Sequence, residues 1–149
     1  MKAISVLEPW AYCIFNLGKD VENRSWHTHH RGPLVICSSA RLEPGWNQIT
    51  YEYWKDYVMP EEIRAKLPGR WIDLKALLTP GMALGVVTVV SCQLVYASPW
   101  ADLSQWNWVI KNPRPFANPF AVKGRLGLYD LPDNLVMNGK PQTKKEPTQ

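Results

Sequence analysis

The chain has 149 residues, a length that suits one domain, and 46% of them are apolar while 20% are charged. This composition excludes a disordered chain, a collagen-like chain and a coiled-coil rod. The 17 basic and 13 acidic residues leave a formal net charge of only +4, and three lysines and one glutamate in residues 138–149 account for half of it. Net charge alone therefore does not indicate a large duplex-binding surface.

Three features of the sequence bear on the cellular compartment. The longest apolar run, residues 82–90, is far shorter than the roughly 18–20 residues that a membrane-spanning helix needs, so we expect no membrane partner. The N-terminal apolar stretch alternates with polar residues and has no small-residue cleavage site, which argues against secretion. Cys13, Cys37 and Cys92 are widely spaced and odd in number, so they predict neither a disulfide framework nor a C-x-x-C metal site. We therefore expect a cytoplasmic protein.

The N-terminal part of the chain predicts strands around one short helix. Residues 2–7 suit a first strand. Apolar residues then recur at helical spacing, so residues 9–17 predict a helix, and Gly18 suits a left-handed cap at its end. Residues 20–26 contain too few helix formers to restart a helix and are expected to be extended. Residues 34–39, rich in β-branched and small side chains, predict a buried strand.

The middle of the chain predicts two helices. Residues 44–58 form the first, on which Trp46, Ile49, Tyr53 and Tyr57 recur at helical spacing. This aromatic stripe is expected to face the core; if it is exposed instead, it becomes a candidate docking face. A second helix is predicted from Pro60 through Leu67.

The C-terminal half predicts mainly strands. Residues 82–96 give the strongest strand signal, and residues 106–110 and 121–131 predict two more. Short strands with Gly and Pro turns around one or two helices favour an α+β fold built on a small, strongly bent sheet or barrel. Residues 133–149 are predicted to be a polar, disordered tail, which leaves residues 1–132 as the single domain.

The densest polar cluster of the first half contains Lys19, Glu22 and Arg24, flanked by Trp10 and Trp26. Alternate side chains of a strand share a face, so Glu22, Arg24 and Trp26 are expected on one side. Cations suit phosphate, polar edges suit a base and indoles suit stacking, so the cluster contains the components of a nucleotide pocket. The alternative is a solvated edge strand with a Glu22–Arg24 ion pair of little energetic consequence.

A second cluster combines Lys111, Arg114 and Lys123 with the preceding Trp106 and Trp108. Basic residues interleaved with aromatic ones are typical of surfaces that bind single-stranded or loop RNA. The alternative is a proline-rich connection whose basic side chains are merely exposed.

Other chemistries have little support in the sequence. His27 and His29 would share a strand face, but no further ligand follows at a metal-binding spacing, so we expect no metal. Neither a glycine-rich phosphate loop nor a Gly-x-Ser-x-Gly turn is present, and the cysteines lie in predicted apolar elements. No cofactor is expected.

Several segments together resemble the ASCH domain, a family related to the PUA-like domains. The resemblance runs in order from about Met1 to Leu131, and its most specific part is the Lys-x-x-Glu-x-Arg motif with its following Trp. The segments that carry it are Ser-Val-Leu-Glu-Pro-Trp-Ala (5–11), Lys-Asp-Val-Glu-Asn-Arg-Ser-Trp (19–26), Arg-Gly-Pro-Leu-Val-Ile-Cys-Ser-Ser (31–39), Trp-Val-Ile-Lys-Asn-Pro-Arg (108–114) and Val-Lys-Gly-Arg-Leu-Gly-Leu (122–128).

The resemblance implies a PUA-like small β-barrel with flanking helices and a cleft beside the first helix that binds RNA or modified nucleotides. A carboxylate in such a cleft suits a base or sugar donor rather than a bare polyphosphate. The residues that the resemblance assigns to the cleft are Lys19, Glu22, Arg24, Trp10, Ser39, Arg114 and Lys123.

Three positions depart from the family pattern. Leu17 stands where a glycine is usual, and Gly18 follows it, so the turn before Lys19 is expected to differ. Glu8 replaces the usual glutamine before Pro-Trp and is expected to add a second acid near the pocket. Cys37 replaces the common histidine of the third strand.

The leading hypothesis is therefore a nucleic-acid-binding module for RNA, single-stranded nucleic acid or a nucleotide. The competing hypothesis is a small hydrolase, either a ribonuclease or an amidohydrolase of a modified pyrimidine nucleoside, with Lys19 and Glu22 as acid and base. The amidohydrolase branch of the superfamily uses a threonine nucleophile three residues after its lysine, and Glu22 occupies that position. DNA against RNA and the oligomeric state stay open.

Overall fold

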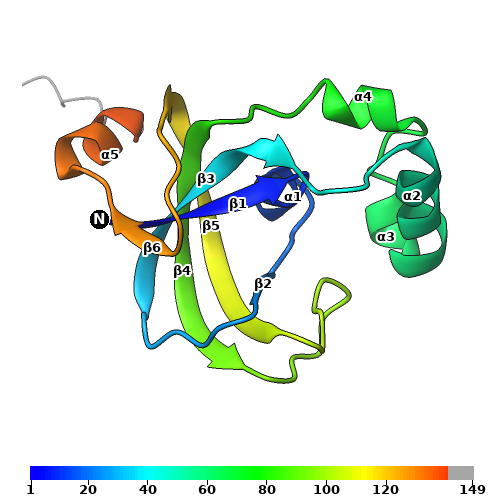
Figure 1. The fold of residues 1–149 in the computed structure, drawn as a ribbon, viewed down its shortest axis with the longest axis horizontal. Coiled ribbons are helices and arrows are strands. Elements are labelled where there is room, and N and C mark those ends of the chain that lie inside the picture. The colour runs from blue at the N-terminus through cyan, green and yellow to red at the C-terminus, as the bar shows by residue number, and fades with distance from the viewer. Residues whose placement is uncertain (141–149) are drawn as a thin grey trace, which may run out of the picture.

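The computed structural model of the protein describes residues 1–140 and is an α+β structure (Figure 1). Helices α2, α3 and α4 lie at one end of the sheet, and α5 lies at the other. The strands are β1 (Lys2–Glu8), β2 (Val21–Arg24), β3 (Gly32–Leu42), β4 (Met82–Gln93), β5 (Trp106–Ala121) and β6 (Leu128–Asp130). The helices are α1 (Trp10–Asn16), α2 (Gln48–Tyr53), the π-helical η1 (Trp54–Val58), α3 (Glu61–Arg64), α4 (Trp71–Lys75) and α5 (Asp133–Gly139).

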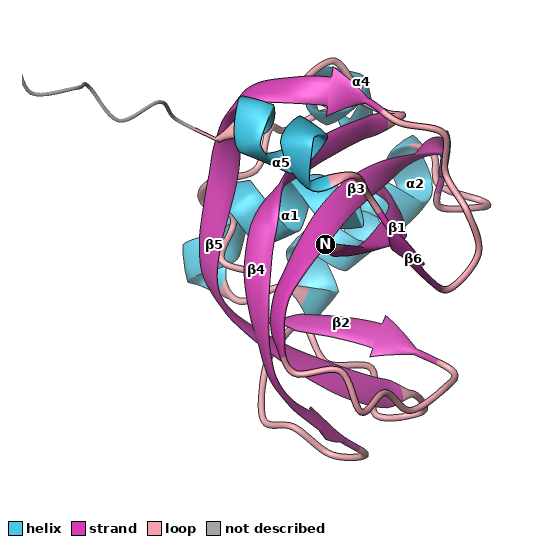
Figure 2. Ribbon diagram, turned by 90° about the vertical axis from the view of Figure 1, so that its left-hand side faces the viewer, coloured by secondary structure: helices cyan, strands magenta, loops and turns pink. Residues whose placement is uncertain are grey.

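The six strands form one mixed sheet in the order β2-β5-β4-β3-β1-β6. β1 and β3 are parallel, and the other neighbouring pairs are antiparallel. Register shifts interrupt the β3–β4 and β4–β5 ladders, and such bulges increase the local bend of a sheet. Figure 2 shows the resulting strong curvature of β3, β4 and β5. The predicted barrel is not confirmed, because β2 and β6 remain at opposite edges with no ladder between them in residues 1–140.

The turn after α1 sets up the start of β2. Gly18 has φ +71°, and the backbone N–H groups of Leu17 and Lys19 donate to the Cys13 carbonyl at 3.0 and 3.1 Å. This confirms the left-handed cap predicted at Gly18, since glycine adopts a positive φ without steric cost. The inner face of α1 packs on the sheet through Ile14, within the core that also contains Trp108.

The proline-rich segment of the second basic cluster is part of a strand. We predicted separate strands at residues 106–110 and 121–131, but β5 runs without interruption from Trp106 to Ala121. Two residues of β5, Asn112 and Pro113, lie opposite Val87 alone, and Asn112 has φ +52°. A bulge of this kind accommodates a proline that has no N–H to donate.

The predicted helix over residues 44–58 is shorter and faces the other way. α2 begins at Gln48 after the Asn47 cap and continues into η1. Tyr51 and Trp54 are buried, whereas Ile49, Tyr53 and Tyr57 of the predicted stripe are 78%, 63% and 80% exposed. The prediction that this stripe faces the core was wrong. Trp46 lies before the start of the helix, so a spacing counted from Trp46 does not identify the buried face. The helix predicted over residues 60–67 spans only Glu61–Arg64 as α3, and α4 was not predicted.

The predicted tail is wrong over its first part. Residues 133–139 form α5, whose Val136 is buried and whose Gly139 lies 3.1 Å, measured from an ideal Cβ, from atoms of Phe116 and Phe120. The rest of the predicted tail, residues 141–149, lies outside the described residues. Cys13 and Cys37 are buried, as expected from their predicted elements. Within residues 1–140, the helices are all too short to cross a membrane.

Gly85 is expected to be essential for packing β4 against its neighbours. A Cβ at this position would lie 2.5 Å from the Arg114 carbonyl oxygen and 2.7 Å from Cε1 of Phe15. We therefore expect Gly85→Ala to lower the free energy of unfolding by about 1–3 kcal/mol, the usual cost of overpacking. Urea unfolding measures the loss. Gly69→Ala is the control, because its Cβ would meet nothing within 4 Å; an equal loss in both variants would contradict the packing argument.

Candidate functional site

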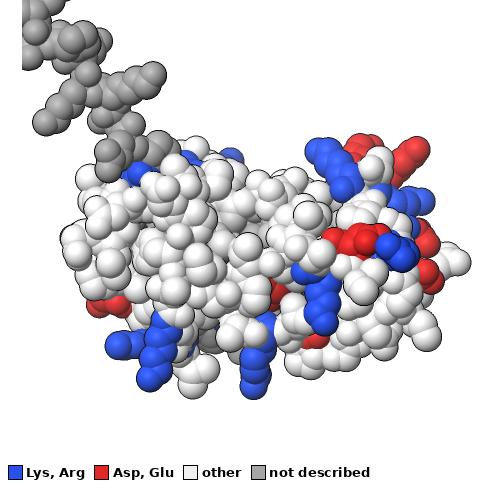
Figure 3. Space-filling view, turned by 90° about the horizontal axis from the view of Figure 1, so that it is seen from above, with Lys and Arg blue, Asp and Glu red and all other residues white. Residues whose placement is uncertain are grey.

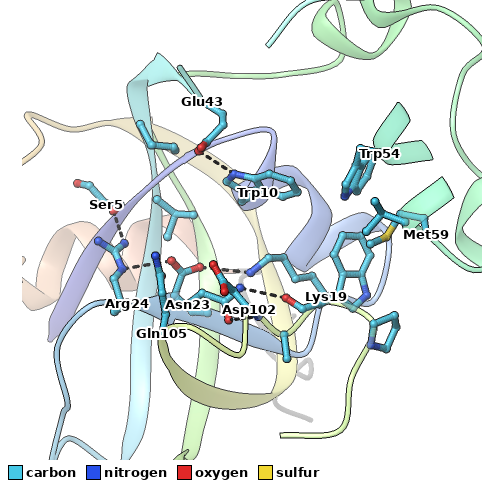
Figure 4. Close-up of a pocket in the computed structure, with 17 residues that line it drawn as sticks. Ser5, Trp10, Lys19, Asn23, Arg24, Glu43, Trp54, Met59, Asp102 and Gln105 are labelled. Carbon is cyan, nitrogen blue, oxygen red and sulfur yellow. Dashed lines mark hydrogen bonds and ion pairs between the residues drawn. The ribbon is translucent and has the colours of Figure 1, made fainter. Parts of the chain in front are cut away.

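A cleft of about 480 Å³ opens between β1, β2, η1 and the loop that joins β4 to β5 (Figure 4). Its volume lies within the range of small-molecule sites. Three indoles line it, those of Trp10, Trp54 and Trp100. Its polar lining residues are Ser5, Lys19, Glu22, Asn23, Arg24, Glu43, Asp102 and Gln105.

Glu22 lies between two cations on one side of the cleft. Its Oε2 is 3.5 Å from Lys19 Nζ, and its Oε1 is 3.2 Å from Arg24 Nε. Lys19 also donates to the Val21 carbonyl, and Arg24 Nη2 donates to the Ser5 carbonyl at 2.6 Å. Lys19 and Glu22 are only 5% and 6% exposed. The Lys19–Glu22 pair is therefore buried and the Glu22–Arg24 pair is partly buried, so β2 is an edge strand but its polar face is not the solvated one of the alternative.

The backbone explains why these side chains converge. β2 pairs with β5 so that Glu22 is opposite Trp108 and Arg24 is opposite Trp106. The alternation of a strand places Glu22 and Arg24 on the same face, as predicted. The Gly18 turn brings Lys19 to the start of this face, within reach of Glu22 three residues later.

Trp10 forms the opposite wall of the cleft. Its Nε1 donates to Glu43 Oε2 at 3.0 Å, which fixes the ring from its edge. The ring packs against Trp54 with centroids 5.6 Å apart, and Trp54 in turn lies 6.0 Å from Trp100. Figure 4 shows Trp10 on one side of the cleft, with Lys19 and Asp102 on the other.

A network of asparagines holds the third wall, which sequence reasoning missed. The fully buried Asn107 donates from Nδ2 to Asn23 Oδ1 and to the Asp102 carbonyl, each at 2.9 Å. Asn23 donates to the Trp100 carbonyl and accepts from the Asp102 N–H, both at 3.0 Å. The available signal was a polar Asn107 within an apolar predicted strand, because a buried amide needs partners.

Four of the predicted site residues lie elsewhere. Trp26 packs on Trp108, with centroids 4.7 Å apart, and Ser39 Oγ accepts from the Arg41 N–H. Arg114 Nη1 donates to the Asn112 carbonyl and to Thr88 Oγ1, and Lys123 is exposed after β5. None of the four lines the cleft. Arg114 is eight residues beyond Trp106 on one continuous strand, so β5 carries it away from the cleft.

The cleft is not the cation-rich pocket that the sequence predicted. Its two cations, Lys19 and Arg24, share the lining with three carboxylates, those of Glu22, Glu43 and Asp102. Seen from above, acidic and basic side chains lie together at the end that carries α2 to α4, and much of the remaining visible face carries none (Figure 3). The charge distribution therefore does not form a broad basic track in this view.

The departures from the family pattern lie in the core rather than in the cleft. Leu17 and Cys37 are buried, and burial raises the pKa of the Cys37 thiol. Glu8 is fully buried and does not line the cleft, contrary to our expectation. Its Oε1 accepts from the Tyr12 N–H at 2.9 Å, but its Oε2 has no hydrogen-bond partner in residues 1–140. Burial raises the pKa of Glu8 above its usual value.

The histidines pack as aromatic rings. His27 lies 4.6 Å from His29 and 4.8 Å from Trp106 between ring centroids. Within the described part of the chain, no three side chains of His, Cys, Asp or Glu gather as a metal site would require.

The bent mixed sheet, with its cleft beside β1 and β2, defines a small α+β domain. The family model of the ASCH domain matches residues 4–120, a range that contains every lining residue of the cleft, and the chain belongs to the ASCH domain family. Its relatives include proteins named activating signal cointegrator 1 from Homo sapiens and Mus musculus, which are 27% and 26% identical to it over 150 residues. The match covers 96% of this chain but only 24% of each relative, so the chain spans about a quarter of their length.

The raised pKa of Glu8 gives a pH dependence of known sign. Since the pKa in the folded state lies above the unfolded value of 4.5, the stability that protonated Glu8 contributes is full below that value and is lost as the pH rises through the folded pKa. The Glu8→Gln variant has no ionisable group at this position. We therefore expect the wild-type protein to lose stability relative to this variant as the pH rises from 4.5 through the folded-state pKa of Glu8. Urea unfolding of both proteins from acidic to neutral pH tests this; a difference that is constant with pH would contradict it.

Proposed function

We propose that the cleft binds a nucleotide or a short single-stranded RNA segment, with one base inside it. The observation that carries the proposal is the convergence of buried Lys19 and Glu22 with partly exposed Arg24 opposite the indole of Trp10, across a cleft of nucleotide size. Membership of the ASCH domain family supports the same ligand class. The cleft volume of about 480 Å³ favours a single unpaired base over a duplex.

Different walls of the cleft would contact different parts of such a ligand. Trp10 offers an indole for stacking, and base–aromatic stacking contributes about 1–3 kcal/mol per base. Glu22 and Gln105 supply polar groups for the edges of the base or the ribose.

Arg24 is the cation best placed for a phosphate. Its side chain is 23% exposed, whereas that of Lys19 is buried. Its Nη2 contacts the Ser5 carbonyl, whereas its Nη1 has no hydrogen-bond partner in residues 1–140. Arginine in this position can donate to phosphate or ribose oxygens at the mouth of the cleft.

Lys19 and Glu22 are less suited to acid–base catalysis than the competing hypothesis requires. Lys19 donates to Val21 and to Glu22, and Glu22 contacts a cation through each carboxylate oxygen. Both groups are therefore engaged in holding the cleft together. Turnover of an RNA oligonucleotide or a modified pyrimidine nucleoside by the wild-type protein would nevertheless favour the hydrolase.

Replacing Arg24 with alanine is expected to weaken the binding of a short single-stranded RNA by roughly tenfold, the effect of losing one charged hydrogen bond. The slope of log affinity against log salt concentration should also become less steep, by about 0.7 per lost phosphate contact. Fluorescence anisotropy across a series of salt concentrations measures both.

The matched control is Arg70→Ala, since Arg70 is exposed, pairs with Asp73 and lies outside the cleft. We expect it to bind RNA as the wild type does. Circular dichroism would verify that both variants are folded, and Arg24→Lys offers a variant that keeps the charge. Equal affinity and equal salt dependence in the wild type and the folded Arg24→Ala variant would refute the role of Arg24.

A further inference from the structure

Of the three carboxylates that line the cleft, Glu22 pairs with both cations, whereas Glu43 and Asp102 form no ion pair in residues 1–140. Lys19 and Arg24 contact Glu22 and two backbone carbonyls. By contrast, Glu43 uses only Oε2, for Trp10, and Asp102 uses only Oδ1, which accepts from the N–H and Oγ of Ser104 at 2.9 and 2.6 Å. The second oxygen of each carboxylate has no partner in residues 1–140.

These two carboxylates stand on opposite sides of the space that a ligand would fill. Figure 4 shows Glu43 beside Trp10 and Asp102 across the cleft. The lining contains three carboxylates, including that of Glu22, and only two cations. The cleft thus carries a formal negative charge, although the protein as a whole is positive.

The indoles add a second preference for positive charge. Trp10, Trp54 and Trp100 all line the cleft, and the face of an indole attracts a cation electrostatically. A flat ring that carries a delocalised positive charge can stack on Trp10 and have its charge compensated by Glu43 and Asp102. A neutral ring gains only the stacking.

From this geometry we propose that the cleft prefers a nucleobase with a fixed positive charge, such as an N-methylated purine, over the neutral parent base. The inference rests on the proposed function, since it specifies which nucleotide the same cleft selects. A nucleotide fits better than a methylated ammonium group of a peptide, because Gln105 also lines the cleft and its amide is suited to the edge of a planar base. The Gln105 side chain has no hydrogen-bond partner in residues 1–140.

Two isomeric ligands test the charge directly. 1-Methyladenosine 5′-monophosphate is protonated and carries a positive base at neutral pH, whereas N6-methyladenosine 5′-monophosphate carries one methyl group on the same purine but has a neutral base. We expect isothermal titration to show that the full chain binds the cationic isomer roughly tenfold more tightly than the neutral isomer or adenosine 5′-monophosphate. 7-Methylguanosine and guanosine 5′-monophosphates, compared at mildly acidic pH, should show the same order.

Two substitutions test the residues. Glu43→Gln and Asp102→Asn keep the size of each side chain and an oxygen acceptor, and together they should lower the ratio of the two affinities several-fold, because only the attraction of the indoles for a cation then remains. Glu62→Gln, on the exposed surface of α3, removes a charge outside the cleft and should leave the ratio unchanged.

The outcomes separate this inference from the proposed function. Binding of all nucleotides with equal affinity, or a ratio that the double substitution leaves unchanged, would overturn the inference and leave the proposed function intact. Failure of every nucleotide and of single-stranded RNA to bind would overturn both. Binding of a trimethyl-lysine peptide without binding of any nucleotide would also overturn both.

Discussion

The structure depends above all on the burial of the Glu22 carboxylate between Lys19 and Arg24. A carboxylate removed from water needs compensating charge, and removal of one partner of a buried ion pair typically costs about 3–5 kcal/mol because the other is left unpaired. The three residues therefore have to be accommodated together. Pairing these three charges requires the turn at Gly18 and the position of the short strand β2 on β5. The turn and the strand together form the inner surface of the cleft.

The buried ion pairs leave little of the cationic charge of the cleft available. Lys19 and Glu22 are engaged with one another, Arg24 is partly exposed, and the lining also contains three indoles and two further carboxylates. A protein with a positive net charge can thus contain a local site of the opposite sign. Net charge describes long-range attraction of a nucleic acid, whereas the binding that we propose depends on the lining of the cleft.

Local pattern predicted the parts of the site that lie close together in the sequence. The two-residue period of a strand placed Glu22 beside Arg24, and Gly18 marked its own left-handed turn. The sequence pattern did not predict contacts between residues that are distant in the sequence. Asn23 and Asn107 meet across the sheet, 84 residues apart, and nothing local to either shows the pairing. The resemblance grouped Arg114 with the cleft, but a continuous β5 carries it away. The burial of α5 likewise depends on aromatic side chains of β5 distant in sequence.

The hydrogen bonds of Asn23 and Asn107 couple the shape of the cleft to strand register. Asn23 faces Asn107 in the observed β2–β5 alignment, and a shift of β2 by one residue would turn the Asn23 amide to the opposite face. The loop carrying Trp100 and Asp102 would then lose the two hydrogen bonds that it makes with the Asn23 side chain, and Asn107 would lose its Asn23 partner. A misaligned chain could still bury apolar surface, but the wall of the cleft that this loop forms would lose part of its support. The shape of the cleft thus depends on the same strand alignment as the fold itself.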